Sequence, residues 1–276
     1  MTSRPRHVVD FHTHAFPEKV AARAITTLTE AYQVEAHGEA TVPGLLRAMD
    51  EAGVDVSVIA PVATRPDQVR SINDWAAALQ TDRIVCFGAL HPALTDAAAE
   101  VERMVSLGIK GVKLQPNFQG FEPDDQRLWP LYEAAAGRLI VLFHSGQEIK
   151  AVERIHSRPE SLARVHKAFP RLMMVVAHMG GYRVWDEVRR HLVGEEVYFD
   201  TSYCDERDLS AADMRDLIGA HGAHRVLFGT DYPWGEVSRD LDRLCAMGLG
   251  EAELEAIAWR NAAELLGLRL GEDSGG

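Results

Sequence analysis

The chain has 276 residues, of which 46% are hydrophobic and 25% are charged, and its formal net charge is −12 at pH 7. These values are ordinary for a globular enzyme domain, and the acidic balance argues against nucleic acid or an anionic membrane surface as a partner. The sequence shows no apolar signal segment, no apolar stretch long enough to cross a bilayer and no metal-type spacing of its three cysteines, so a cytoplasmic protein with reduced thiols is expected.

Short β-rich runs alternate along the chain with longer amphipathic stretches. The expected strands are residues 7–12, 54–62, 84–91, 109–116, 139–146, 172–180, 197–203 and 225–233. The expected helices are residues 17–32, 42–53, 67–80, 95–108, 126–137, 160–169, 182–192, 210–222, 237–248 and 253–268. Several strands are continuously apolar, which is typical of parallel strands that are covered on both faces.

Eight strands that alternate with helices predict an α/β fold of the (β/α)8 TIM-barrel type. A doubly wound open sheet is the main rival, but it usually has fewer strands and a glycine-rich turn after the first one. No linker or repeat divides the sequence, so a single domain over residues 1–276 is predicted, with a frayed tail at 269–276. The sequence leaves open whether the protein forms a homodimer.

Polar side chains stand at the ends of most expected strands, where the active site of a barrel lies. In strand order these residues are His12 and His14, His91, Lys113 and Gln115, His144, His178, Asp200 and Ser202, and Asp231. One strand-end histidine is commonly just a hydrogen-bonded polar cap. Four histidines and an aspartate at one rim instead indicate a metal site.

Four short motifs at these strand ends resemble the amidohydrolase superfamily: "DFHTH", "FHSG", "AHMGG" and "FGTDYPW". Together with "GIKGVKLQP" and "RNAAELLGL", they are most similar to its amidohydrolase-related branch (amidohydrolase 2), which includes the aminocarboxymuconate-semialdehyde decarboxylases. The resemblance spans residues 7–268. It implies one divalent ion, most commonly Zn²⁺ with Mn²⁺ or another first-row ion as alternatives, held by His12, His14, His144 and Asp231. It also implies that His178 is the catalytic residue beside the metal, together with Asp231.

Two further charged residues are expected to support the metal from inside the barrel. Binuclear relatives use a carbamylated lysine at the position that Lys113 resembles, although a buried lysine paired to a neighbour is the favoured interpretation here. Strand alternation places Asp10 on the face of His12 and His14, one step deeper in the barrel. We expect Asp10 to accept hydrogen bonds from Lys113 or a ligand histidine. If the strand phase is different, Asp10 faces the helices and caps a backbone amide.

The expected activity is that of a metal-dependent hydrolase, in which metal-activated water attacks an ester, lactone or amide carbonyl of a small organic substrate, such as a carboxylic acid derivative. The alternative is a non-oxidative decarboxylase of an aromatic or unsaturated carboxylic acid, and a second alternative is a catalytically silent metal-binding barrel. The small residues Ser145 and Gly146 after His144 favour hydrolysis slightly, because they would leave space beside the metal. Substrate contacts are expected from Phe16, His91, Gln115, Phe118, Tyr203 and Trp234.

Overall fold

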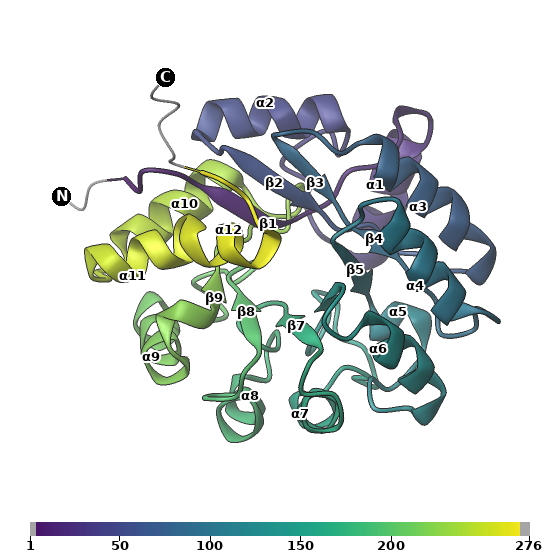
Figure 1. The fold of residues 1–276 in the computed structure, drawn as a ribbon. Coiled ribbons are helices and arrows are strands. Elements are labelled where there is room, and N and C mark those ends of the chain that lie inside the picture. The colour runs from purple at the N-terminus through teal and green to yellow at the C-terminus, as the bar shows by residue number, and fades with distance from the viewer. Residues whose placement is uncertain (1–3, 271–276) are drawn as a thin grey trace.

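Parallel strands form the centre of the structure, and helices surround them (Figure 1). The computed structural model describes residues 4–270, so residues 271–276 of the tail expected at 269–276 lie outside the described range. The strands are β1 (Val9–Thr13), β2 (Val56–Ile59), β3 (Ile84–Cys86), β4 (Gly88–Ala89), β5 (Gly111–Leu114), β6 (Ile140–Phe143), β7 (Met173–Val176), β8 (Tyr198–Asp200) and β9 (Val226–Leu227). They pair in the orders β1-β2-β3 and β4-β5-β6-β7-β8-β9.

Backbone hydrogen bonds between the first and the last strand segments close the ring. Phe11 N donates to Phe228 O over 2.8 Å, and Asp231 N donates to His12 O over 2.7 Å. The first and last polar strand ends are therefore neighbours in space, although 217 residues separate His14 from Asp231. The predicted TIM barrel is confirmed.

The third expected strand, residues 84–91, is interrupted at Phe87 and becomes β3 and β4. The side chain of Asn73 stands beside the break, where its Oδ1 accepts a hydrogen bond from Ala89 N over 2.8 Å. Its Nδ2 donates to Glu100 Oε1 over 2.7 Å. A Cβ atom at Gly88 would lie 2.6 Å from Asn73 Oδ1, so a glycine is required for this close approach.

The α-helices form the outer layer. They are α1 (Glu18–Tyr32), α2 (Val42–Ala52), α3 (Val69–Ala78), α4 (Ala97–Ser106), α5 (Pro116–Gln119), α6 (Trp129–Ala135), α7 (Pro159–Ala168), α8 (Trp185–His191), α9 (Ala211–His221), α10 (Val237–Ala246), α11 (Glu251–Glu255) and α12 (Asn261–Leu266). Short 3-10 turns are η1 (Pro66–Gln68), η2 (Gln126–Leu128) and η3 (Ala223–Arg225), and a π-helical segment, η4 (Ala256–Arg260), interrupts the last expected helix. Among the described helices, none combines the length and the apolarity needed to cross a membrane.

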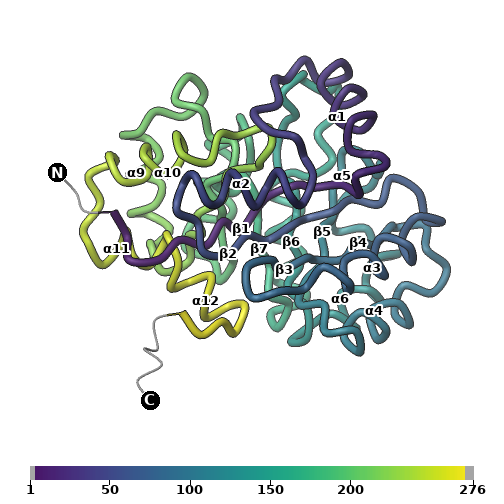
Figure 2. The backbone as a smooth tube through the Cα atoms, turned by 90° about the horizontal axis from the view of Figure 1, so that it is seen from above, coloured from purple at the N-terminus to yellow at the C-terminus, as the bar shows by residue number. Residues whose placement is uncertain are grey.

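Apolar side chains pack both between the strands and the helices and inside the barrel. The inner cluster contains Phe11 and Phe87, whose ring centroids are 5.8 Å apart, and it ends on Ala262 and Leu266 of α12. Helix α12 therefore covers the amino-terminal end of the strands, whereas α1 and α5 lie on the opposite side of the barrel (Figures 1 and 2). The carboxyl ends of the strands face α1 and α5, and polar side chains gather there.

The hydrogen bonds of Asn73 generate a stability prediction. Asn73→Ala leaves the buried Ala89 N–H and Glu100 carboxylate without this partner, which should lower the free energy of unfolding by about 2–3 kcal/mol. Ser71→Ala, an exposed change two residues earlier, should alter it by less than about 0.5 kcal/mol. Urea unfolding of both variants measures the difference, and equal stability of the two would contradict the role given to Asn73.

Candidate active site

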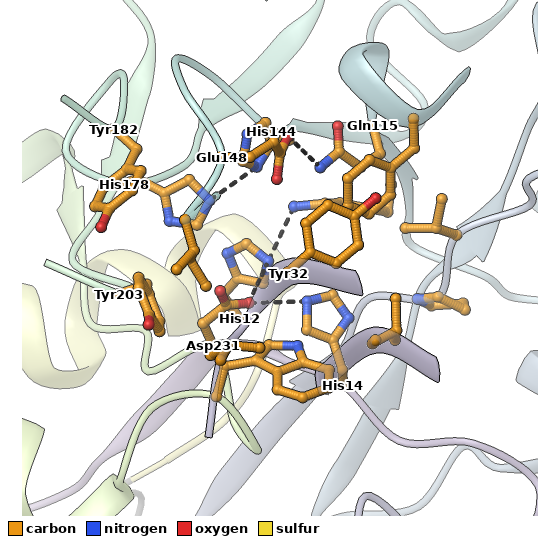
Figure 3. A pocket seen from close by; sticks show the side chains of 18 of the residues that line it. His12, His14, Tyr32, Gln115, His144, Glu148, His178, Tyr182, Tyr203 and Asp231 are labelled. Carbon is orange, nitrogen blue, oxygen red and sulfur yellow. Dashed lines mark hydrogen bonds and ion pairs between the residues drawn. The ribbon is translucent and has the colours of Figure 1, made fainter. Parts of the chain in front are cut away.

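A pocket opens at the carboxyl ends of the strands, and side chains of α1 and α5 contribute to its lining. Figure 3 shows the side chains around it. Most of the residues singled out in the sequence line it: His12, His14, Phe16, Lys113, Gln115, Phe118, His144, His178, Tyr203, Asp231 and Trp234. His91 is not among the described lining residues, and its Nδ1 instead accepts a hydrogen bond from Ala93 N over 3.1 Å. The sequence therefore located the pocket, but His91 belongs to a turn beside it.

Three of the four expected metal ligands converge on one point. Nitrogen atoms of His12 and His14 and a carboxylate oxygen of Asp231 lie within 4.8 Å of one another. His14 Nε2 is 2.9 Å from Asp231 Oδ1, and His12 Nε2 is 3.5 Å from the same oxygen. The fourth expected ligand, His144, contacts His178 instead, with 3.0 Å between His144 Nδ1 and His178 Nε2.

The Asp200 carboxylate orients the first of these histidines. Asp200 is completely buried at the end of β8, and its Oδ2 lies 2.9 Å from His12 Nδ1. Burial alone would raise the pKa of Asp200, but the electrostatic interaction and the hydrogen bond with the His12 ring hold that pKa well below its usual range. Because Asp200 is ionised, His12 Nδ1 carries the hydrogen and donates it, so His12 Nε2 presents a lone pair to the pocket. The sequence placed Asp200 at a strand end without assigning this role.

Asp200 also holds the backbone that follows β7. Its Oδ1 accepts hydrogen bonds from His178 N over 3.0 Å and from Ser202 N over 3.1 Å. His178 has a φ angle of 61°, in the left-handed region that side chains other than glycine rarely adopt. Asp231 and Tyr203, which also line the pocket, have φ angles of 65° and 49°. Such strain gathers at functional sites when the surrounding contacts enforce it, as they do here.

His178 is a neutral imidazole in this environment. Burial and the nearby charge of His144 lower the pKa of His178 to about 3. Its Nδ1 lies 3.0 Å from the carbonyl oxygen of Ser202, which can only accept, so Nδ1 carries the hydrogen. His178 Nε2 consequently has its lone pair directed toward His144 and the pocket. At neutral pH His178 is therefore unprotonated at Nε2, and this nitrogen can accept a hydrogen bond from a group in the pocket.

Asp231 is an ionised carboxylate at the same end of the pocket. Burial would raise its pKa, but the charges of His12 and His14 and the hydrogen bond from His14 hold the pKa far below its ordinary value. Lys113 adds a cation at this point, because its Nζ lies 2.9 Å from His12 Nε2. Burial lowers the pKa of Lys113 to about 8, so the lysine keeps most of its charge at pH 7.

The position of Asp10 differs from the expectation based on strand alternation. Asp10 is buried, but its Oδ1 accepts hydrogen bonds from the backbone N–H groups of Thr230 (3.0 Å) and His12 (3.3 Å), and its Oδ2 accepts one from Thr230 Oγ1 (2.7 Å). The pairing register of β1 shifts between Asp10 and Thr13, so strict alternation fails in this strand. Asp10 thus joins β1 to the residue before Asp231 instead of binding Lys113 or an imidazole.

Sequence reasoning missed Glu148, a buried carboxylate in the pocket wall. Glu148 Oε1 accepts hydrogen bonds from Asn117 Nδ2 over 2.7 Å and from Gln115 Nε2 over 3.1 Å. It is also 3.0 Å from His144 Nε2, although the N–H direction there is not aligned for a hydrogen bond. Burial would raise the pKa of Glu148, but the charge of His144 and the two amide donors lower it. No spacing in the sequence signals this residue, because a long irregular loop carries it.

The other walls of the pocket are apolar and largely aromatic. Tyr32 at the end of α1 stacks on Phe118 of α5, with 4.9 Å between ring centroids. Tyr182 and Tyr203 meet edge to face at 5.8 Å. The pocket therefore combines a charged floor with flat aromatic sides, which suits a small planar molecule that bears a polar group at one end.

Comparisons with known proteins agree on the fold and the family. A family model described as Amidohydrolase matches residues 9–268. A gamma-resorcylate decarboxylase from Polaromonas sp. (strain JS666) is 25% identical over 81% of this chain and 86% of its own length. A TIM-barrel protein from Bordetella bronchiseptica superposes with a TM-score of 0.76 at 21% identity, over 95% of this chain and 98% of that chain. A dihydroxybenzoic acid decarboxylase from Polaromonas sp. JS666, solved with manganese and the inhibitor 2-nitroresorcinol, gives 0.72 at 19% identity over 98% and 99%.

The contact between Asp200 and His12 generates a prediction about metal affinity. Asp200→Asn keeps the shape but removes the charge that fixes the His12 tautomer, so Mn²⁺ or Zn²⁺ should bind about tenfold to one-hundredfold more weakly. Asp205→Asn is the matched control, because Asp205 binds the exposed Arg207 on the following loop. Equilibrium dialysis measures both affinities, and an unchanged affinity in Asp200→Asn would contradict the role of Asp200.

Proposed function

This chain belongs to the amidohydrolase family, and from that premise we propose that it is a metal-dependent decarboxylase of an aromatic carboxylic acid. One observation carries the proposal: the His12, His14 and Asp231 cluster lies at the floor of a flat-sided aromatic pocket. The names of two compared proteins support it, since both describe decarboxylases and one of them acts on a dihydroxybenzoic acid.

The residues at the floor fit a divalent first-row ion. Two imidazole nitrogens and a carboxylate oxygen converge, and Asp200 directs the lone pair of His12 toward them. We assign His12, His14, Asp231 and the adjacent His144 to this ion, with Mn²⁺ or Zn²⁺ as candidates; manganese is bound in a compared decarboxylase. When bound, the ion would supply positive charge that attracts the substrate carboxylate.

The protein's own groups position the acid and handle its proton. Phe118, Tyr32 and Trp234 hold the ring between apolar surfaces and exclude water from it. Decarboxylation then breaks the bond between ring and carboxyl carbon, releases carbon dioxide and places a proton on the ring carbon. Asp231 and His178 are the groups at the floor that can carry this proton. Because one is ionised and the other neutral at rest, one of them must first take the proton from water or the substrate.

The sequence favoured a hydrolase partly because the small residues after His144 were expected to leave space beside the metal, and the structure gives another reason for their size. Gly146 has a φ angle of 85°, and a Cβ atom there would lie 2.4 Å from the backbone nitrogen of Tyr182. Ser145 Oγ donates to Gly180 O over 2.8 Å. Both residues are small because two loops approach closely, so they do not open space for a water nucleophile. Hydrolysis of an ester, lactone or amide is the alternative outcome of the experiment below.

An isotope experiment distinguishes the two reactions. The manganese-loaded protein in D₂O should convert a dihydroxybenzoate into the phenol with one deuterium at the former carboxyl position and release carbon dioxide. A hydrolase would instead place ¹⁸O from H₂¹⁸O in its product when offered esters, lactones and amides. Mass spectrometry of both series decides between them.

The control for the isotope experiment is His178→Asn, which removes the proposed proton carrier at Nε2 and should reduce turnover about one-hundredfold or more. Oxygen incorporation from the ester, lactone or amide series, with no carbon dioxide from any aromatic acid, would refute the decarboxylase proposal.

A further inference from the structure

The two oxygens of the Glu148 carboxylate have different surroundings. Glu148 lies on the loop between β6 and α7, and only 6% of its surface is exposed. Oε1 receives the contacts from Asn117, Gln115 and His144. Among the described residues, none donates a hydrogen bond to Oε2. The carboxylate is therefore anchored through one oxygen, while the other is left for a partner from outside the chain.

The second oxygen belongs to the pocket. Glu148 lines it, and Figure 3 shows its carboxylate at the head of the pocket, between His144 and Gln115. Asp231 and His14, two of the three converging residues, lie at the opposite end of the same view. Because Glu148 lines the pocket, water can reach Oε2 when the pocket is empty, and a ligand that displaces this water without offering a donor would lose free energy. The group that binds there must be a hydrogen-bond donor.

The loop holds Glu148 in a fixed place. Asn117 Nδ2, which donates to Glu148, also donates to Gly146 O over 3.0 Å. Asn117 Oδ1 accepts from His156 N over 2.9 Å, on the far side of the same loop. The carboxylate is thus positioned before any ligand binds, which is the condition for a specific contact.

The charges of the pocket limit what the ligand can carry at this end. Lys113 is the only lysine or arginine among the described residues that line the pocket, and it contacts His12 at the floor. A second carboxylate on the ligand would meet the Glu148 carboxylate at an end of the pocket where the described lining offers no lysine or arginine to balance the two charges. A neutral hydroxyl would instead donate to the carboxylate and form a charge-assisted hydrogen bond.

We propose that Glu148 Oε2 is a subsite for a hydroxyl group on the substrate ring, so that the pocket selects a hydroxylated acid with a single carboxyl group and rejects dicarboxylates. The identity of the ring acid rests on the proposed function, but the subsite does not depend on turnover. Glu148 borders the site at His144 but is not one of the three converging residues His12, His14 and Asp231, so its contact with the ring hydroxyl determines specificity.

Ligands that cannot lose carbon dioxide test the subsite separately from the reaction. The nitrophenol isomers and the matching nitroanisoles carry a nitro group in place of a carboxylate, and the anisoles lack the hydrogen that Glu148 would accept. Calorimetry on manganese-loaded protein, in buffer acidic enough to keep the phenol protonated, should show at least one nitrophenol binding about tenfold or more tightly than its anisole. In Glu148→Gln this preference should fall to within about threefold.

The dicarboxylate isophthalate and the monocarboxylate benzoate test the charge argument. Isophthalate should bind the unmodified protein more weakly than benzoate. In Glu148→Gln the ratio of the isophthalate Kd to the benzoate Kd should be at least about tenfold smaller. Glu122→Gln is the matched control, because Glu122 pairs with Arg154 outside the pocket and should change neither ratio.

Metal content and thermal unfolding of each variant distinguish a specific contact from a structural one. Loss of rigidity alone would weaken both members of a ligand pair equally and leave their ratio unchanged. Three results would refute the subsite. The first is an affinity ratio between the two ligands of a pair that is the same in Glu148→Gln as in the unmodified protein. The others are the absence of any preference for the hydroxyl in the unmodified protein and the loss of the metal from Glu148→Gln. If the affinity ratios change in Glu148→Gln as expected but no aromatic acid is decarboxylated, the subsite is supported and only the proposed reaction is refuted.

Discussion

The hydrogen bond from His12 to Asp200 is the constraint on which the site depends. It joins β1 to β8, two strands that only β9 separates, over 2.9 Å, and both side chains are almost fully buried. A buried carboxylate is stable only when several donors satisfy it, and Asp200 takes the His12 ring, the backbone of His178 and both donors of Ser202. One charge therefore sets the tautomer of a proposed metal ligand and the left-handed backbone of the proposed proton carrier. Barrel closure makes this contact feasible, because it places the ends of β1, β8 and β9 together.

The fold and the floor of the pocket could be predicted from the sequence because both depend on local pattern. Apolar runs that end in polar residues mark buried parallel strands, and carboxyl ends of such strands must meet at one rim of a barrel. His12, His14 and Asp231 were found in this way. The strand phase was predicted wrongly, because a register shift between Asp10 and Thr13 breaks the alternation that would place Asp10 beside His12 and His14. The break at Phe87 could not be recognised either, because it lies within a continuous apolar run. The expected substrate contact of His91 stays a prediction, and in the structure this residue lies in a turn and is not among the described residues that line the pocket.

Glu148 and the role of Asp200 could not be predicted, because they depend on how distant segments meet. The partners of Glu148 come from α5 and its N-cap, a helix of four residues that periodicity cannot detect. The same limit applies to the reaction. The proposed ligands His12 and Asp231 would suit hydrolysis or decarboxylation, so the motifs alone do not distinguish the two reactions. The argument for decarboxylation therefore rests on the walls of the pocket. Their aromatic side chains and the anchored Glu148 carboxylate favour a flat hydroxylated acid as the proposed substrate.

The central claim is that one divalent ion binds where His12, His14 and Asp231 converge, with His144 as the fourth ligand. Anomalous X-ray scattering from crystals of the manganese-loaded protein locates such an ion directly. The account predicts a single peak per chain, about 2.0–2.3 Å from the His12 and His14 Nε2 atoms and from an Asp231 oxygen, with His144 in contact and His178 outside contact distance. No peak at this position, or a peak coordinated by Glu148 in place of Asp231, would contradict it.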